Sequence, residues 1–362
     1  MFDFLLVGSG LAGMTAARIL AEKGKKVLVI DKRNHIGGNI YDYYNEEGIL
    51  IHKYGPHIFH TNNKEVFEFL SRFTQWREYQ HKVLSYVNGM LVPMPINLDT
   101  INMLYNTNYD SLTIKDFFNS VRENVEAVNN SKDVIVSQVG EELYKLFFEG
   151  YTKKQWDLYP YELGKEVTSR VPTRYNRDPR YFIDKYQGMP KHGYTKMAEN
   201  IINHENIKVM LNTSFKEIKD EVKYSKVIFT GCIDEFFKEK HGKLPYRSLK
   251  FIEETYDKEC YQSVGVVNYP NDYDYTRITE YKYLTGQKHE KTTIMKEISN
   301  ADGEPYYPIP KAENKHIYEL YKDEAENTKN VYFLGRLGTY SYMNMDAVVY
   351  QALEFCEHKL CI

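Results

Sequence analysis

The amino-acid sequence predicts an α/β fold in which one discontinuous domain is interrupted by a helical insertion and by an antiparallel β-sheet insertion. The chain starts with a predicted strand, a glycine-rich turn, a helix and a second strand over residues 2–30. Apolar residues recur at helical spacing from about 98 to 168, and segments rich in Val, Thr and Tyr follow from about 246 to 298. The last fifty residues return to a strand followed by a helix, which is typical of the first domain.

The boundaries of these parts follow from where the pattern changes. We assign to the α/β domain residues 1–75, 192–245 and 311–362. The helical insertion spans residues 98–170. The antiparallel sheet domain comprises residues 76–97, 171–191 and 246–310. At the junction of these last two parts, residues 170–181 (RVPTRYNRDPRY) are rich in proline and charge without periodicity, so we expect a mobile loop there.

The first strand, residues 2–7, ends in a turn with the pattern GxGxxG. Gly8 allows the tight turn, Gly10 lets backbone amides approach a pyrophosphate, and Gly13 lets the following helix pack closely on the strand. The helix N-terminus adds partial positive charge where the phosphates would lie. Asp31 ends the second strand near the spacing at which a carboxylate accepts from ribose hydroxyl groups. A glycine turn without a ligand is the alternative, but the whole context predicts a dinucleotide site.

Two further elements indicate which dinucleotide binds. A second glycine pair, Gly37-Gly38, follows directly after the acid, and an extended FAD pyrophosphate often needs such a further loop. Near the C-terminus, a predicted strand at 331–334 is followed by Gly335-Arg336 and by a helix that starts near Asp346. Alone, this segment would read as a last strand and a surface helix. Joined to the glycine motifs, it is typical of FAD enzymes, whose helix dipole faces the flavin.

Composition excludes several other classes of protein. The formal net charge of −3 gives no reason to expect nucleic acid or an anionic membrane surface. The sequence contains no apolar run of about 18 residues and no signal peptide, and its four cysteines are scattered, so we expect a cytoplasmic location. The 33 tyrosines are explained mostly by amphipathic packing, although a subset could line a polar ligand.

Several local strings resemble the UDP-galactopyranose mutases, and they extend over nearly the whole chain. They are HKYGPHIFHT at 52–61, GYTKKQW at 150–156, YRSL at 246–249, YTRI at 275–278, EPYYP at 304–308 and GRL at 335–337. The resemblance implies a homodimeric flavoenzyme that interconverts UDP-galactopyranose and UDP-galactofuranose for cell-surface glycan synthesis. It also implies the mechanism, in which N5 of reduced FAD attacks the sugar C1 and displaces UDP, and the adduct opens before the furanose closes.

The same resemblance assigns the substrate site. Arg170 and Arg277 match a pair of arginines on the substrate diphosphate, which agrees with the bidentate fit of guanidinium to phosphate. A helical face that would contact uridine carries Phe147, Tyr151, Thr152 and Trp156; a core stripe is the alternative. Further substrate candidates are Tyr181, Arg247, Asn268, Tyr307, Tyr342 and His81. His81 stands where some relatives carry asparagine, and Asn344 stands where others carry aspartate.

On the cofactor side, His60 matches a histidine close to the flavin ring, although a lone histidine is more often structural. The candidate cofactor residues are Gly8, Ser9, Gly10, Gly13, Asp31, Lys32, Gly38, Asn39, His57, Ile58, Val209, Gly335, Arg336, Met345 and Asp346. The sequence contains no second dinucleotide motif, so we expect an external reductant such as NAD(P)H. A flavin amine oxidase or desaturase, or a non-catalytic FAD-binding protein, would share the glycine motifs and stays an alternative.

Overall fold

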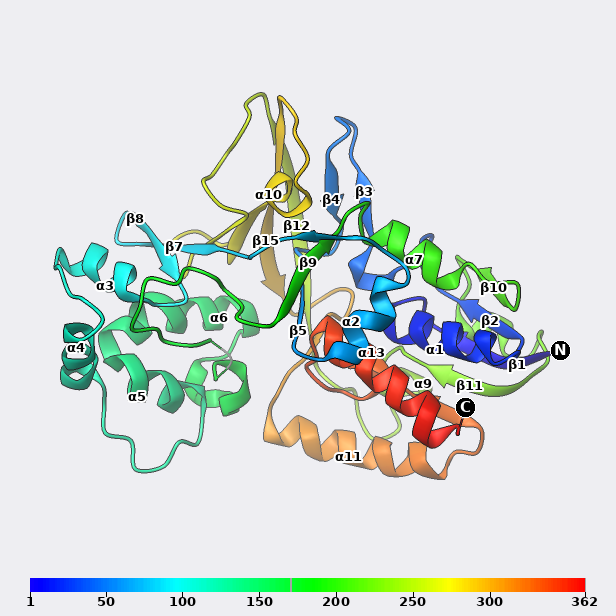
Figure 1. The fold of residues 1–362 in the computed structure, drawn as a ribbon. Helices are drawn as coiled ribbons and strands as arrows, with labels where there is room; N and C mark the ends of the chain where they lie inside the picture. The colour runs from blue at the N-terminus through cyan, green and yellow to red at the C-terminus, as the bar shows by residue number, and fades with distance from the viewer. Residues whose placement is uncertain (170, 362) are drawn as a thin grey trace.

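The computed structural model describes residues 1–169 and 171–361 of the chain. An α/β domain that holds both termini lies on the right of Figure 1, a group of helices lies on the left, and antiparallel strands lie between them. This arrangement confirms the predicted fold class, because the parallel sheet is built from the start, the middle and the end of the chain.

The parallel sheet has five strands in the order β10-β2-β1-β11-β17. Their bounds are Ile207–Met210, Val27–Ile30, Phe2–Val7, Tyr224–Phe229 and Val331–Phe333. The four residues of β2 are all buried, as expected for a strand that is covered on both faces. Helix α1 (Leu11–Glu22) packs against α13 (Met345–Glu354) and α7 (Tyr194–Ile202), and its alanines permit close packing. Other helices here are α2 (Lys64–Ser71), α8 (Phe215–Ile218), α9 (Ile233–Phe236), α11 (Ala312–Asn327), α12 (Gly335–Gly338), η1 (Gly38–Ile40) and η5 (Phe355–Lys359).

The second sheet has seven strands in the order β16-β12-β15-β14-β13-β7-β8. Their bounds are Tyr307–Pro308, Tyr246–Tyr256, Thr292–Asn300, Arg277–Glu280, Val266–Asn268, Val83–Val87 and Met90–Met94. The strands pair antiparallel except for β13 and β7, which are parallel and join two distant parts of the chain. Helix α10 (Tyr281–Thr285) follows β14, and two small sheets consist of β3 (Asp42–Tyr44) with β4 (Leu50–His52), and of β5 (Phe59–Thr61), β9 (Tyr186–Pro190) and β6 (Trp76–Glu78).

The helices on the left of Figure 1 enclose a separate apolar core. They are α3 (Leu98–Tyr105), α4 (Thr113–Val121), α5 (Ser131–Tyr144), η2 (Lys145–Glu149), α6 (Gly150–Trp156), η3 (Pro160–Glu162) and η4 (Lys165–Val167). Gly140 has φ +81° inside α5, and a Cβ there would lie 2.1 Å from the carbonyl oxygen of Val121. This glycine therefore allows α5 to bend where α4 ends. After the bend, α5, η2 and α6 run on without interruption.

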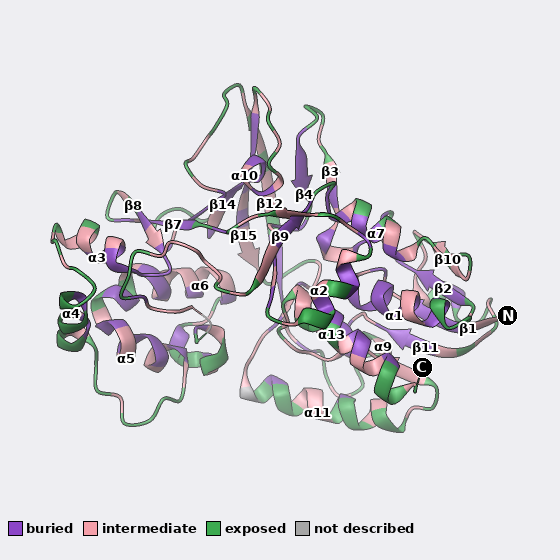
Figure 2. Cartoon of the chain, viewed as in Figure 1, coloured by how far each residue is buried: buried purple, intermediate pink, exposed green. Residues whose placement is uncertain are grey.

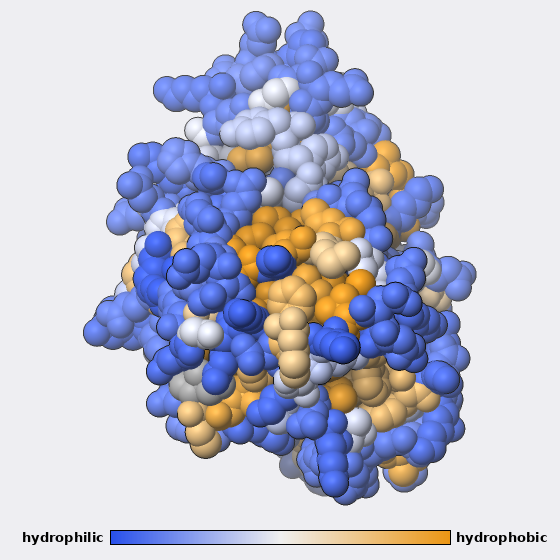
Figure 3. All heavy atoms as spheres, turned by 90° about the vertical axis from the view of Figure 1, so that its right-hand side faces the viewer, coloured by the Kyte–Doolittle hydropathy of each residue, from blue (hydrophilic) through white to orange (hydrophobic). Residues whose placement is uncertain are grey.

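Burial follows the layers of the fold. Figure 2 shows buried strands and inner helix faces, whereas much of α11 is exposed. The face of the α/β domain seen in Figure 3 is hydrophilic around an apolar area near its centre. Among the described helices, none combines the length and the apolar character that crossing a membrane would require.

Candidate functional site

Two cavities adjoin each other in the middle of the molecule. The first, of about 430 Å³, lies at the carboxyl ends of β1, β2 and β11, where open parallel sheets bind ligands. The second, of about 480 Å³, lies between the helical part and the seven-stranded sheet. His57, Arg336 and Met345 line both cavities. A ligand in the first cavity would therefore meet a ligand in the second.

The first cavity has a floor made of glycines that leave no room for side chains. A Cβ on Gly38, which has φ +56°, would lie 2.7 Å from the Cα of Gly10. A Cβ on Gly13 would lie 2.0 Å from the carbonyl oxygen of Gly8. Gly10 is also the N-cap of α1 and contributes no side chain there, so the first amides of the helix face the cavity. This geometry fits a pyrophosphate held at a helix N-terminus.

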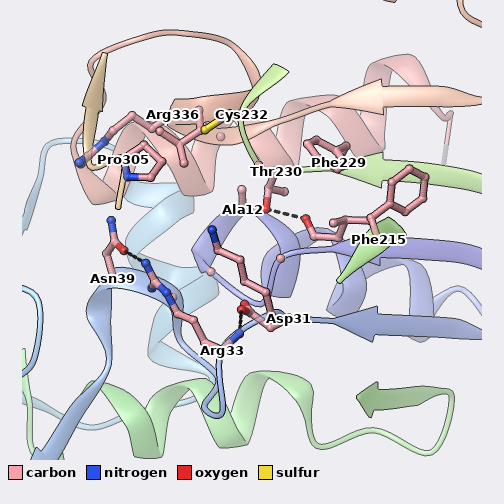
Figure 4. A pocket seen from close by; sticks show the side chains of 18 of the residues that line it. Ala12, Asp31, Arg33, Asn39, Phe215, Phe229, Thr230, Cys232, Pro305 and Arg336 are labelled. Atoms are coloured by element: carbon pink, nitrogen blue, oxygen red, sulfur yellow. Dashed lines mark hydrogen bonds between the residues drawn. The ribbon is translucent and has the colours of Figure 1, made fainter. Parts of the chain in front are cut away.

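Asp31 joins the glycine turn to the end of β2 and also faces the cavity (Figure 4). Its Oδ2 accepts from the amide and the hydroxyl of Ser9 at 2.8 and 2.7 Å, and its Oδ1 accepts from the amide of Arg33 at 2.9 Å. The Arg33 guanidinium donates to Asn39 at 3.0 Å and to Glu304 at 2.9 Å. It also lies over the ring of Tyr54 at 4.3 Å. The sequence analysis did not identify Arg33 as a residue of this cavity, although its position two residues after Asp31 could have indicated it.

Most of the candidate cofactor residues line the first cavity. They are Gly8, Gly10, Asp31, Lys32, Gly38, Asn39, His57, Gly335, Arg336 and Met345. Five others lie outside this lining. Ser9 and Gly13 are buried behind it, Ile58 lines the second cavity, and Asp346 accepts from the hydroxyl of Thr61 at 2.9 Å. Val209 on β10 packs against the core of the α/β domain.

The second cavity has an aromatic wall. Phe147 from η2 and the α6 residues Tyr151, Thr152 and Trp156 line it from one side, because η2 and α6 form one continuous helical segment. Tyr307 and Tyr342 line it as well. The ring of Trp156 lies 6.2 Å from Tyr307 and 5.9 Å from Tyr342. Such a wall suits a flat base or a sugar face.

Arg277 lines the second cavity and is paired with a buried carboxylate. It donates to both oxygens of Glu297, from Nη2 at 2.8 and 3.0 Å and from Nε at 3.0 Å. Glu297 is 1% exposed and lies opposite Arg277 on β15. Burial disfavours the charged guanidinium, but the carboxylate outweighs it and raises the pKa of Arg277. Arg277 is therefore a fixed cation at the cavity wall.

Two histidines line the second cavity with well-defined partners. His60 stacks on Phe182 with the ring centroids 3.6 Å apart, and its Nδ1 lies 2.9 Å from a carboxylate oxygen of Asp184. His81 is 4% exposed, and its Nδ1 lies 3.0 Å from the hydroxyl of Tyr79. These neighbours fix the orientation of both imidazole rings at the cavity wall.

The remaining candidates divide between the cavity and its surroundings. Tyr181, Asn268 and Asn344 line the second cavity. Arg247 is buried outside it and donates to the carbonyl of Gln155 at 3.1 Å. Arg170 lies outside the described residues. Cavity residues that the sequence did not single out include Gln155, Arg174, Phe182 and Asp184; residue type alone gave no signal for them.

Three histidines make acid stability a testable property: His52 and His81 are buried, and His57 is half-buried between the two cavities. Burial lowers the pKa of His52, His57 and His81 from 6.5 to about 3. The unfolded chain takes up these protons below pH 6.5 and the folded chain does not, so unfolding becomes easier as the pH falls from 6.5 towards 3. We expect each histidine to remove about 1.4 kcal/mol of unfolding free energy per pH unit in that window. Chemical denaturation at a fixed FAD concentration measures the slope. His81→Asn should reduce it, and a pH-independent free energy would contradict the expectation.

Comparisons with known proteins show which proteins the chain resembles. A family model described as UDP-galactopyranose mutase matches residues 146–342, and one for an NAD(P)-binding Rossmann-like domain matches residues 6–73. A probable UDP-galactopyranose mutase from Klebsiella pneumoniae is 40% identical over 365 residues, covering 99% of this chain and 94% of that protein. A dTDP-fucopyranose mutase from Escherichia coli is 38% identical over 366 residues, covering 98% and 97% respectively. A crystal structure of reduced UDP-galactopyranose mutase shares the fold, with a TM-score of 0.81 and 19% identity, and covers 100% of this chain and 96% of that one.

Proposed function

The chain belongs to the UDP-galactopyranose mutase family, and we propose that it converts UDP-galactopyranose to UDP-galactofuranose and back with reduced FAD as its cofactor. The observation that carries this proposal is the junction of the two cavities at His57, Arg336 and Met345. A nucleotide sugar in the second cavity would place its sugar beside a flavin in the first. The match to mutases over nearly the whole chain favours this reaction over that of an amine oxidase or desaturase.

The residues of this chain would bind and orient, and the cofactor would supply the reacting atom. Reduced FAD, when bound, would supply an electron-rich ring nitrogen as the nucleophile. The glycine floor and α1 would hold its pyrophosphate, and Arg336 is fixed between the cavities by donating to the carbonyl of Met343 at 2.7 Å. Arg277 would hold the leaving diphosphate close to the sugar, so that the diphosphate recombines without diffusing away.

The identity of the sugar nucleotide is the finer part of the proposal. Relatives with similar identity are described as acting on UDP-galactose and on dTDP-fucose. The two substrates differ in the base methyl group, in the ribose 2′-hydroxyl and in the sugar 6-hydroxyl. We favour UDP-galactose, because the family model that matches residues 146–342 is that of UDP-galactopyranose mutase. The homodimer and the NAD(P)H reductant stay predictions from the sequence.

A direct assay tests the function. FAD-loaded protein is reduced with dithionite and incubated with UDP-galactofuranose or, in parallel, with dTDP-fucofuranose, and the products are separated by chromatography. We expect UDP-galactopyranose to form faster than dTDP-fucopyranose, because the chain would recognise the uridine and the 6-hydroxyl. An unreduced sample is the control and should be inactive. Faster conversion of the dTDP sugar would reassign the substrate, and conversion of neither would overturn the proposal.

A further inference from the structure

Lys154 is an α6 residue whose ammonium group enters a loop of another part of the fold. The loop, residues 269–276, connects β13 to β14. Nζ of Lys154 lies within hydrogen-bond distance of the main-chain carbonyl oxygens of Tyr269 (2.5 Å), Asp272 (3.0 Å), Tyr273 (3.0 Å) and Tyr275 (3.2 Å), and its three N–H groups are shared among these four acceptors. Burial lowers the pKa of Lys154 to about 8, and Asp272 and Asp274 counteract that effect. The side chain thus acts as a bound cation within a cage of carbonyl oxygens.

The two ends of this loop are residues of the second cavity. Asn268 ends β13, Arg277 begins β14, and the two are directly opposite each other in the sheet. The loop itself is not a favourable turn, because Tyr273 has φ +60°, which is uncommon for a bulky side chain. The loop conformation therefore depends on contacts from outside it, and Lys154 supplies four of them.

The helical segment η2–α6 and the loop 269–276 contact each other at two more points. The side-chain amide of Asn271 donates to the carbonyls of Lys145 at 3.4 Å and Leu146 at 3.1 Å. A Cβ on Gly150 would lie 2.6 Å from the carbonyl oxygen of Pro270, so the two backbones approach closely there. The same segment, η2 followed by α6, carries Phe147 and Trp156 on the cavity wall.

We propose that Lys154 is a positioning residue that fixes the distance between the base-binding segment η2–α6 and the strand that begins with Arg277. This inference rests on the proposed function, in which the segment holds the base and Arg277 holds the diphosphate of one ligand. Without the ammonium, the loop would relax, and the two ends of the nucleotide would no longer be held at the same time. Lys154 itself does not line the second cavity, so it acts through its neighbours.

The test uses FAD-loaded protein and UDP, with Lys154→Met and Lys153→Met as a matched pair. Lys154→Met keeps the aliphatic stem and removes only the charged donors. Lys153 is the adjacent residue and pairs with the exposed Asp157, so its loss should have little effect. We expect UDP to bind about tenfold more weakly to Lys154→Met, with a rise in KM larger than the fall in kcat. Lys153→Met should bind UDP as the wild type does.

Chemical rescue distinguishes positioning from general loss of structure. In Lys154→Ala, n-propylammonium replaces the missing atoms, and we expect it to restore UDP binding in part; tetramethylammonium, which cannot donate hydrogen bonds, should not. Unchanged UDP affinity in Lys154→Met, equal loss in Lys153→Met, or loss of folding in both Lys154 variants would overturn the inference. If the wild type binds neither UDP nor dTDP, the proposed function fails instead.

Discussion

Gly38→Ala is expected to weaken FAD binding strongly while the chain stays folded. The added Cβ would lie 2.7 Å from the Cα of Gly10, which is backbone and cannot rotate away, so the two glycine loops must separate. The φ of +56° adds strain for any residue with a side chain. Separation of the two loops relieves overpacking and backbone strain of about 2–4 kcal/mol in the FAD-free protein. Binding FAD would restore that strain, so FAD should bind on the order of a hundredfold more weakly. Flavin absorbance per purified chain, followed by titration with FAD, measures this.

Gly48→Ala is the matched control for that substitution. Gly48 has φ +74° in the exposed turn between β3 and β4, and a Cβ there would meet nothing within 4 Å. It reproduces the backbone strain without the close approach. Equal FAD affinity in the two variants would mean that the glycine floor does not hold the cofactor. The melting temperature of the flavin-free Gly38→Ala protein shows whether the fold survived.

The fold class could be predicted because its signals are local. The apolar run of β2, the glycine turn and the helical spacing of Phe147, Tyr151 and Trp156 are each read within a short window, and the cavities collect most of these residues. Pairings across the sheets could not be predicted in this way. Glu297 lies opposite Arg277 because of the register of β14 with β15, and the sequence near either residue contains no pattern that predicts this ion pair.

Arg247 and Lys154 illustrate how the assembled fold determines the contacts of a polar side chain. Arg247 belongs to a string shared with the family, yet it is buried and donates to a main-chain carbonyl at the end of α6. Lys154 looks like one of two neighbouring surface lysines in the sequence, but its cage of carbonyls forms only when a loop more than 100 residues further along the chain folds against it. Contacts of this range depend on the assembled fold rather than on residue type.

Substitution of Arg277 is the second change for which we expect a large effect on activity. Arg277→Ala removes a charge-assisted contact to the diphosphate, worth about 1.5–3 kcal/mol, and leaves the buried carboxylate of Glu297 without a partner next to an anionic ligand. We expect kcat/KM to fall by at least about a hundredfold and the melting temperature to fall as well. Arg277→Lys keeps the charge but loses the bidentate fork, so it should recover only part of the activity. Steady-state kinetics of the reduced enzyme and thermal melts measure both effects.

The double variant Arg277→Ala/Glu297→Gln separates binding from stability. It removes the unpaired charge together with the arginine, so the melting temperature should return towards that of the wild type while kcat/KM stays low.

Arg170→Ala should lower kcat/KM about ten- to a hundredfold without a change in melting temperature, if that residue contacts the same diphosphate. Because both arginines would act on one ligand, Arg170→Ala/Arg277→Ala should lose less than the sum of the single effects. An Arg277→Ala enzyme with unchanged kcat/KM would place the diphosphate elsewhere, since no other described residue offers a cation held by a buried carboxylate in that cavity.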